Sequence, residues 1–141
     1  MGKTTNSCYY AGSKQPFASS VVVGDLSRGK LVFCSGWSGR LIETGEVRAD
    51  DPAVQTVDAL DKVKRCLEEA GTSLDNIVKL MIYVKDTPKN QKIVQDTYMD
   101  NLRKHAPSLA EDMPACTWIG VDCLAFPSML VELDVTAIVP R

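Results

Sequence analysis

The sequence predicts an α+β fold in which two helices pack on one face of a β-sheet. Residues 51–71 and 87–102 repeat apolar side chains at helical spacing, and five short apolar or β-branched runs lie around them. Each amphipathic helix must bury its apolar stripe, so we expect both against one face of the sheet. The other face of the sheet must also be shielded from water. For a chain of 141 residues, packing against another copy of the same chain is the simplest way to bury it.

The first part of the chain predicts a polar arm followed by two strands. Residues 1–15 are small and polar, which is typical of a flexible terminal arm, and residues 16–141 then form a single domain. Residues 19–23 and 30–35 are the runs expected as strands. Residues 38–46 carry turn-forming residues and predict a loop.

The first helix has recognisable ends in the sequence. Asp51 is a suitable N-cap, Pro52 suits the first helical position, and Gly71 suits the position after the helix. The residues of its predicted apolar face are Val54, Val57, Leu60, Val63, Cys66, Leu67 and Ala70.

The rest of the chain predicts a strand, a helix and two more strands. Residues 76–85 are rich in β-branched and aromatic residues, and Thr87-Pro88 repeats the signal of a cap followed by proline. The buried face of the second helix is expected to hold Ile93, Val94, Tyr98 and Leu102. Residues 103–113 predict a loop, and residues 115–121 and 129–139 predict the last two strands.

Composition narrows the functional classes. The net charge is -2 and basic residues are scattered among acids, whereas nucleic-acid binding usually needs a basic field. No apolar run approaches membrane-spanning length, and residues 1–17 lack the apolar stretch of a signal peptide. We therefore expect a cytoplasmic protein that binds neither nucleic acid nor membrane.

Cysteine and histidine counts argue against two further kinds of site. The five cysteines are irregularly spaced with no CxxC pair, which favours free thiols in a reducing compartment. His105 is the single histidine, so neither a histidine-rich metal site nor a Ser-His-Asp triad is expected.

A series of short motifs runs through the chain at regular spacing. These are Pro16-Phe17, LVFCSG (31–36), ETGEV (43–47), QTVDALDKV (55–63), LEEAGTSLDNIVK (67–79), MPA (113–115) and LVELDVTA (130–137). Together they resemble the Rid/YjgF family, whose members are also labelled RidA-like or endoribonuclease L-PSP. The resemblance implies a chorismate-mutase-like fold with a mixed sheet. It also implies a barrel-like homotrimer that holds a small-molecule ligand in the clefts between its subunits.

Family members with the full motif hydrolyse enamines and imines such as 2-aminoacrylate, and they use no metal or organic cofactor. In these members an arginine after Pro-Ala clamps the substrate carboxylate with two parallel hydrogen bonds, and a glutamate on the last strand handles the attacking water. The resemblance places the water-handling role on Glu132, and it places Thr117 beside the clamp position as a further catalytic residue. It also assigns substrate-binding positions to Phe17, Ser35, Gly36 and Gln95.

The clamp position itself departs from the family, because Cys116 occupies it. Cys116 is then either a reactive thiolate or an inert side chain that lines the cleft, and the second interpretation is favoured because no cation is evident beside it. Trp118, on the same strand face, either narrows the cleft or belongs to the core. Arg40, in the loop after Ser35-Gly36, is either a replacement cation or a solvated side chain.

Three functions remain open from the sequence. The first is a hydrolase of carbon–nitrogen bonds in enamine or imine intermediates, weakened or altered because Cys116 cannot clamp a carboxylate. The second is a trimer that binds a small metabolite without chemistry. The third is a ribonuclease, against which the acidic balance of charges counts.

Overall fold

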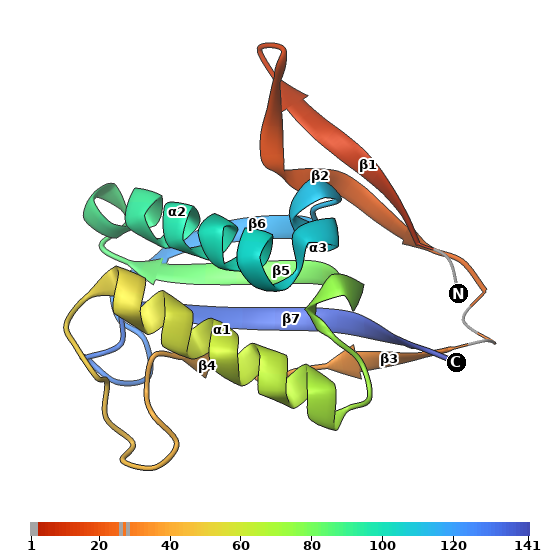
Figure 1. Ribbon diagram of the computed structural model, residues 1–141. Helices are drawn as coiled ribbons and strands as arrows, with labels where there is room; N and C mark the ends of the chain where they lie inside the picture. Colours follow the sequence, from red (N-terminus) through yellow and green to blue (C-terminus); the bar gives the residue numbers. More distant parts are fainter. Residues whose placement is uncertain (1–2, 26, 28) are drawn as a thin grey trace.

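The computed structural model describes residues 3–25, 27 and 29–141 (Figure 1). Its strands are β1 (Lys3–Tyr10), β2 (Ser13–Val23), β3 (Gly29–Phe33), β4 (Trp37–Ser38), β5 (Ile77–Lys85), β6 (Ala115–Val121) and β7 (Val131–Pro140). Its helices are α1 (Pro52–Glu69), the 3-10 turn η2 (Leu74–Asn76), α2 (Thr87–His105) and α3 (Pro107–Glu111). The predicted α+β class is confirmed.

The strands form one mixed sheet in the order β1-β2-β6-β5-β7-β3, with β4 added beside β7. β6 runs parallel to both β2 and β5, whereas β7 is antiparallel to β5, β3 and β4. In Figure 1, α1 and α2 lie side by side across the same face of the sheet. The predicted placement of two long helices on one face is therefore correct.

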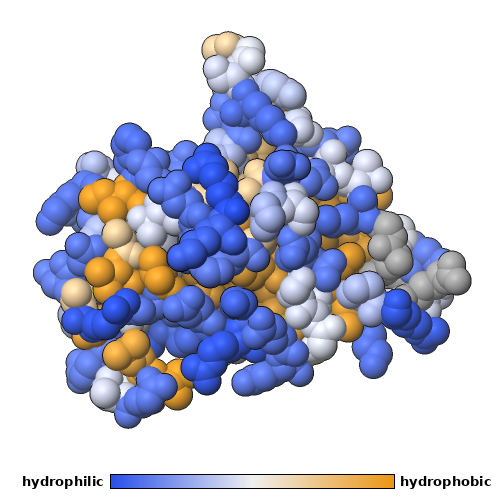
Figure 2. Space-filling model, in the orientation of Figure 1, coloured by the Kyte–Doolittle hydropathy of each residue, from blue (hydrophilic) through white to orange (hydrophobic). Residues whose placement is uncertain are grey.

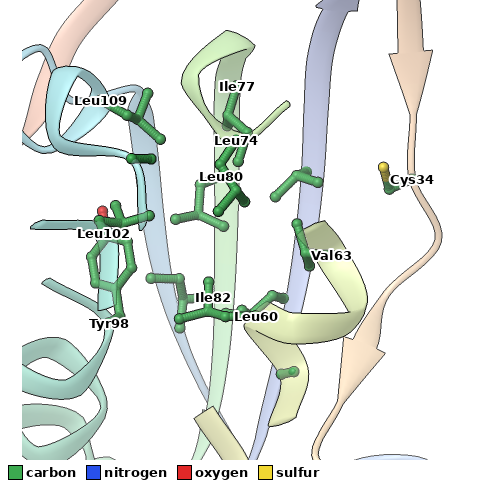
Figure 3. Packing of buried hydrophobic residues seen from close by; sticks show 14 of the residues in the cluster. Cys34, Leu60, Val63, Leu74, Ile77, Leu80, Ile82, Tyr98, Leu102 and Leu109 are labelled. Carbon is green, nitrogen blue, oxygen red and sulfur yellow. The ribbon is translucent and has the colours of Figure 1, made fainter. Parts of the chain in front are cut away.

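The hydrophobic core lies between these two helices and the central strands (Figure 3). Leu80 and Ile82 of β5 stand at its centre, with Tyr98 on the α2 side and Leu60 on the α1 side, all at most 3% exposed. Side chains alternate between the two faces of a strand, so the intervening residues of β5 and β7 point to the opposite, open face.

The ends of α1 agree with the sequence pattern. Asp51 Oδ1 accepts hydrogen bonds from the backbone N–H groups of Ala53 (2.8 Å) and Val54 (3.0 Å), and Pro52 begins the helix. At the other end Gly71 has φ +82°, and Thr72 N–H donates to the Leu67 carbonyl at 2.9 Å. This is the left-handed C-terminal cap that glycine adopts without a Cβ clash.

The buried face of each long helix differs from the predicted stripe. In α1, Gln55, Asp58 and Lys62 are buried at 0–7% exposure, although the apolar pattern did not include them. In α2, Ile93 is 41% exposed while Asn90 is buried, where its side-chain amide donates to the Lys85 carbonyl at 2.8 Å. These polar side chains are tolerated in the interior because their hydrogen bonds and ion pairs replace those to water.

Three further expectations need correction. The sequence predicts a flexible arm over residues 1–15, but residues 3–10 form β1 and pair with β2 as a hairpin; residues 1–2 lie outside the described part. The predicted loop at 103–113 contains the end of α2 and the whole of α3, so the described residues hold three α-helices rather than two. α2 also begins at Thr87, one residue earlier than a Thr87 cap implies.

The open face of the sheet is only partly covered within one chain. Met81 and Tyr83 of β5 and Asp134 of β7 are half-buried there, and Phe33 of the edge strand β3 is 76% exposed. A large exposed aromatic side chain beside a partly buried sheet face is typical of a surface that another molecule covers.

Candidate functional site

Glu132 lies against a glycine backbone at one end of the sheet. It pairs with Ser38 of β4, and it points to the open face because its neighbours Val131 and Leu133 are buried in the core. A Cβ built on Gly36 would run into the Glu132 carboxylate, at 2.9 Å from Cδ. Only glycine at residue 36 therefore lets the carboxylate approach the chain this closely.

A pocket of about 350 Å³ opens beside this contact. Its wall comes from the segment 36–45, from Lys62 of α1 and from residues of the segment 125–132. Trp37 is part of the wall, and its buried indole N–H has no hydrogen-bond partner among the described residues. The pocket thus joins Gly36 and Glu132 to side chains from a helix and two loops.

Arg40 stands in this pocket with its guanidinium oriented by two contacts. Its Cζ lies 3.5 Å from the centre of the Phe126 ring, which is a cation–π stack. Its Nε donates to the Gly45 carbonyl at 2.6 Å. Among the described residues no carboxylate forms a salt bridge with Arg40.

Lys62 supports the loop that carries Arg40. It is 7% exposed, and its ammonium donates to the Arg40 carbonyl. Burial lowers the pKa of Lys62, while the nearby carboxylates of Asp58 and Glu43 oppose this shift. A buried lysine that donates to a backbone carbonyl holds the loop near α1 and leaves the Arg40 side chain available.

Gln55 and Gly39 hold the pocket walls together from behind. The Gln55 amide donates to the carbonyls of Ala49 and Ser128, each at 3.0 Å, and accepts from Leu130 N–H at 2.8 Å. A Cβ at residue 39 would lie 2.8 Å from Gln55 Cα, so this close approach of loop to helix requires glycine. One buried amide therefore connects α1 to the loop that precedes β7.

Cys116 does not lie beside Glu132 within the chain. It pairs with Leu80 across β5 and β6 and packs against the helix-covered core, on the face opposite to Glu132. Burial raises the pKa of Cys116 to about 12, and the nearby Lys79 opposes this only in part. A thiol with so high a pKa is a poor nucleophile at neutral pH, which counts against the reactive-thiolate interpretation.

Trp118 also belongs to the helix side of the sheet. Its ring meets Tyr98 edge to face, with centroids 6.4 Å apart and an interplanar angle of 73°. Of the two alternatives left by the sequence, the packing of Trp118 against the core supports the second.

The other predicted site residues are spread over the chain. Thr117 is exposed on the open face, where its hydroxyl accepts from Lys79 Nζ at 2.7 Å, and Ser35 is exposed next to Gly36. Phe17 is half-buried in β2. Gln95 lines a different pocket of about 580 Å³ between α2, α3 and β2. One chain thus brings together Gly36 and Glu132 but not the rest.

Lys62, Gln55 and Phe126 were missed by the sequence reasoning. Lys62 and Gln55 interrupt the apolar pattern of α1, so their burial had no signal in periodicity. Phe126 carried a weak signal, since it is an aromatic residue in a turn beside Pro127.

Neither metal-binding clusters nor membrane helices occur in the described part of the chain. Within residues 3–25, 27 and 29–141, no three or more His, Cys, Asp or Glu side chains gather as metal ligands would. None of the helices described there is long and apolar enough to cross a membrane.

Comparison with known proteins gives a consistent set of relatives. Residues 12–139 match the family model described as endoribonuclease L-PSP. A RutC family protein of Pyrococcus horikoshii is 34% identical over 79% of this chain and 82% of its own length. The 2-iminobutanoate/2-iminopropanoate deaminase of Escherichia coli is 37% identical over 54% of this chain, and that match spans only 59% of the deaminase.

Solved structures agree with this assignment. The YjgF gene product of Escherichia coli superposes with a TM-score of 0.68 at 29% identity, covering 83% of this chain and 90% of that one. A Rid family protein of unknown function from Yersinia pestis also gives 0.68, at 25% identity with 86% of each chain covered. With sequence and fold in agreement, this chain belongs to the Rid/YjgF family, the family also described as endoribonuclease L-PSP.

Proposed function

We propose that this protein hydrolyses the carbon–nitrogen bond of 2-imino acids and their enamine tautomers, releasing a 2-oxo acid and ammonia. The observation that carries the proposal is the Glu132 carboxylate held against Gly36 at the edge of a small-molecule pocket. The deaminase name of the Escherichia coli relative points to the same chemistry. The pocket volume is at the lower end of the range for small-molecule sites.

The chemistry needs one base and one water molecule. Glu132 accepts a proton from water as the water oxygen forms a bond to the imine carbon, and it passes this proton to the imine nitrogen, which becomes the amino group of a carbinolamine. Glu132 then accepts the hydroxyl proton and passes it to the amino group, and the carbon–nitrogen bond breaks as the carbonyl forms and ammonia leaves. The sum is imine plus water giving 2-oxo acid plus ammonia, with no redox step and no cofactor.

Activity on the smallest substrates is weakened in this proposal, because Cys116 replaces the family's clamp. A thiol cannot form two parallel hydrogen bonds to a carboxylate, and Cys116 is partly buried beside Leu80. Losing one partner of a buried charge-assisted pair typically costs roughly 2–5 kcal/mol. A three-carbon substrate has few other contacts to offset that loss.

The direct test is an assay of imine hydrolysis with 2-iminopropanoate and larger 2-imino acids generated in situ by an amino acid oxidase. Catalase removes peroxide, and the rate of imine loss is followed with and without this protein. We expect accelerated hydrolysis that is slower for 2-iminopropanoate than for acids with larger apolar side chains. No acceleration with any substrate would reject the hydrolase and favour a trimer that only binds a metabolite.

The binding-only alternative has one observation in its favour, the absent clamp at Cys116. It predicts tight binding of a small ligand without ammonia release. The ribonuclease alternative gains no support from the pocket, because its two basic residues do not form the extended basic field that binds a nucleic-acid backbone.

We further propose that the protein is a homotrimer with the open sheet faces turned inward. Phe33 is 76% exposed on that side, and the residues assigned by family resemblance are separated within one chain. A neighbouring copy would cover the exposed aromatic side chain of this face and enclose the Glu132 side of the sheet.

Light scattering is expected to give three times the chain mass of 15.4 kDa at micromolar concentration. A charged substitution on the open face, Phe33→Asp, is expected to shift the mass toward that of one chain. A monomeric wild-type protein would contradict the trimer.

A further inference from the structure

We infer that Arg40 is the carboxylate-binding residue of the Glu132 pocket, and that the pocket accepts 2-imino and 2-oxo acids with apolar side chains. This inference rests on the proposed function for the identity of the ligand. It assigns to the loop between β4 and α1 the role that Cys116 cannot perform.

The guanidinium of Arg40 is oriented but not neutralised. Phe126 stacks on one face at 3.5 Å, and Gly45 accepts from Nε at 2.6 Å. Neither terminal nitrogen of Arg40 has a hydrogen-bond partner among the described residues. Since a guanidinium presents its N–H groups as a planar fork, the free edge can donate to both oxygens of a carboxylate.

Arg48 offers a contrast on the same loop. Its guanidinium forms two hydrogen bonds with the Asp58 carboxylate, at 2.7 and 3.2 Å, and these hydrogen bonds together with the Asp58 charge raise the pKa of Arg48. Arg48 is therefore already paired within the protein, whereas Arg40 is held by an aromatic ring and a carbonyl that leave its charge uncompensated.

The charges of the pocket favour a singly charged anion. Arg40 and Lys62 are its two basic side chains, and Glu132 is its one acid. Lys62 donates to the Arg40 carbonyl, so it holds the loop in place and acts as a positioning residue. A substrate carboxylate on Arg40 would balance the remaining positive charge.

The rest of the lining is apolar and indicates what the carboxylate is attached to. Leu41, Ile42, Phe126 and Met129 contribute to the wall, and Ile42 and Phe126 are 58% and 45% exposed. Figure 2 shows hydrophobic side chains gathered at the lower left, over the loop between β4 and α1. A three-carbon acid would leave most of about 350 Å³ to water, whereas a branched or aromatic side chain would bury this apolar surface.

The test measures binding of the reaction's product class, so that it does not depend on turnover. The probes are 4-methyl-2-oxopentanoate, phenylpyruvate and pyruvate, titrated by calorimetry into the full-length protein at fixed ionic strength. We expect the two larger acids to bind at least about tenfold more tightly than pyruvate, because the pocket wall removes their apolar side chains from water. Equal affinities would overturn the assignment of an apolar side chain.

Variants then test the role of Arg40. Arg40→Gln is expected to weaken binding of 4-methyl-2-oxopentanoate about 10- to 100-fold, because a hydrogen bond to a charged group is lost. Arg40→Lys should retain part of the affinity, since it keeps the charge without the planar fork. Lys64→Gln removes one positive charge from an exposed pair with Glu68 on α1 and should leave binding unchanged.

Two outcomes would overturn the inference: Arg40→Gln that binds like the wild type with an unchanged melting curve, or a wild type that binds none of the three acids. If Arg40→Gln melts early, Arg40→Lys decides, because equal loss in both would then reflect the loop rather than the carboxylate contact. Failure of the proposed function looks different. In that case the 2-oxo acids would still bind and Arg40→Gln would still weaken their binding, but the wild-type protein would not accelerate imine hydrolysis.

Discussion

Glu132→Gln is expected to lower kcat/KM for imine hydrolysis by about 10²- to 10⁴-fold, the range for removal of a general base. The substituted amide has the same shape and still lies against Gly36, where no Cβ crowds it. It can hold a water molecule but cannot accept its proton. The measurement is the rate of imine loss with substrate generated in situ, compared at equal protein concentration.

Asp134→Asn is the matched control for this change. Asp134 lies on the same face of β7, two residues further along, and pairs with Met81 rather than with the pocket strand β4. The Asp134→Asn substitution removes one negative charge from the same face as Glu132→Gln does, and we expect its activity to stay near that of the wild type. Binding of 4-methyl-2-oxopentanoate should survive in Glu132→Gln, since Arg40 is intact. Equal losses of activity in both variants would assign the effect to the charge of the face and not to a base.

Cys116 is expected to react with iodoacetamide at pH 8 about 10³-fold more slowly than a thiol of ordinary pKa. Burial raises its pKa to about 12, so the protonated and unreactive form persists until the pH approaches that value. At pH 8 a thiol of pKa 12 is ionised to about one part in 10⁴. Packing against the core hinders access as well, so labelling should be slower still.

Mass spectrometry of digested protein measures this rate for each cysteine separately. Cys123 is exposed and serves as the internal reference, which should be labelled within the time that leaves Cys116 untouched. Cys34 is a second buried example, because burial and the hydrogen bond from Cys66 at 3.6 Å raise its pKa to about 12. Rapid labelling of Cys116 in the folded protein would restore the reactive-thiolate interpretation.

Local signals in the sequence located several elements correctly. The start and end of α1 follow from Asp51, Pro52 and Gly71, whose capping roles depend on bonds to residues only two to five positions away. β6 has the predicted bounds 115–121 because its ends are also marked locally: Pro114 precedes the run and the polar Asp122 follows it. Where neighbours in sequence decide the structure, pattern and propensity suffice.

Family resemblance carried the assignment of Gly36 and Glu132 to the site, and the tertiary structure places the two residues in contact. Residue spacing alone could not place them together. Glu132 alternates with buried residues, and the same alternation occurs in any strand that has one face toward solvent. Residue spacing could not place Cys116 relative to Glu132 either. The face on which each residue lies depends on how β6, β5 and β7 pair across the sheet.

The sequence by itself determined the fold class, most of the elements and the presence of a cysteine at position 116. The tertiary structure decided which side chains form the pocket. Arg40 stacks on Phe126, Lys62 reaches the Arg40 carbonyl, and Gln55 bonds to Ser128, each a contact between distant parts of the chain. Neither hydrophobic periodicity nor a helix-capping residue indicates such contacts in the sequence, because a buried lysine or glutamine is stable only where folding brings it a hydrogen-bond partner.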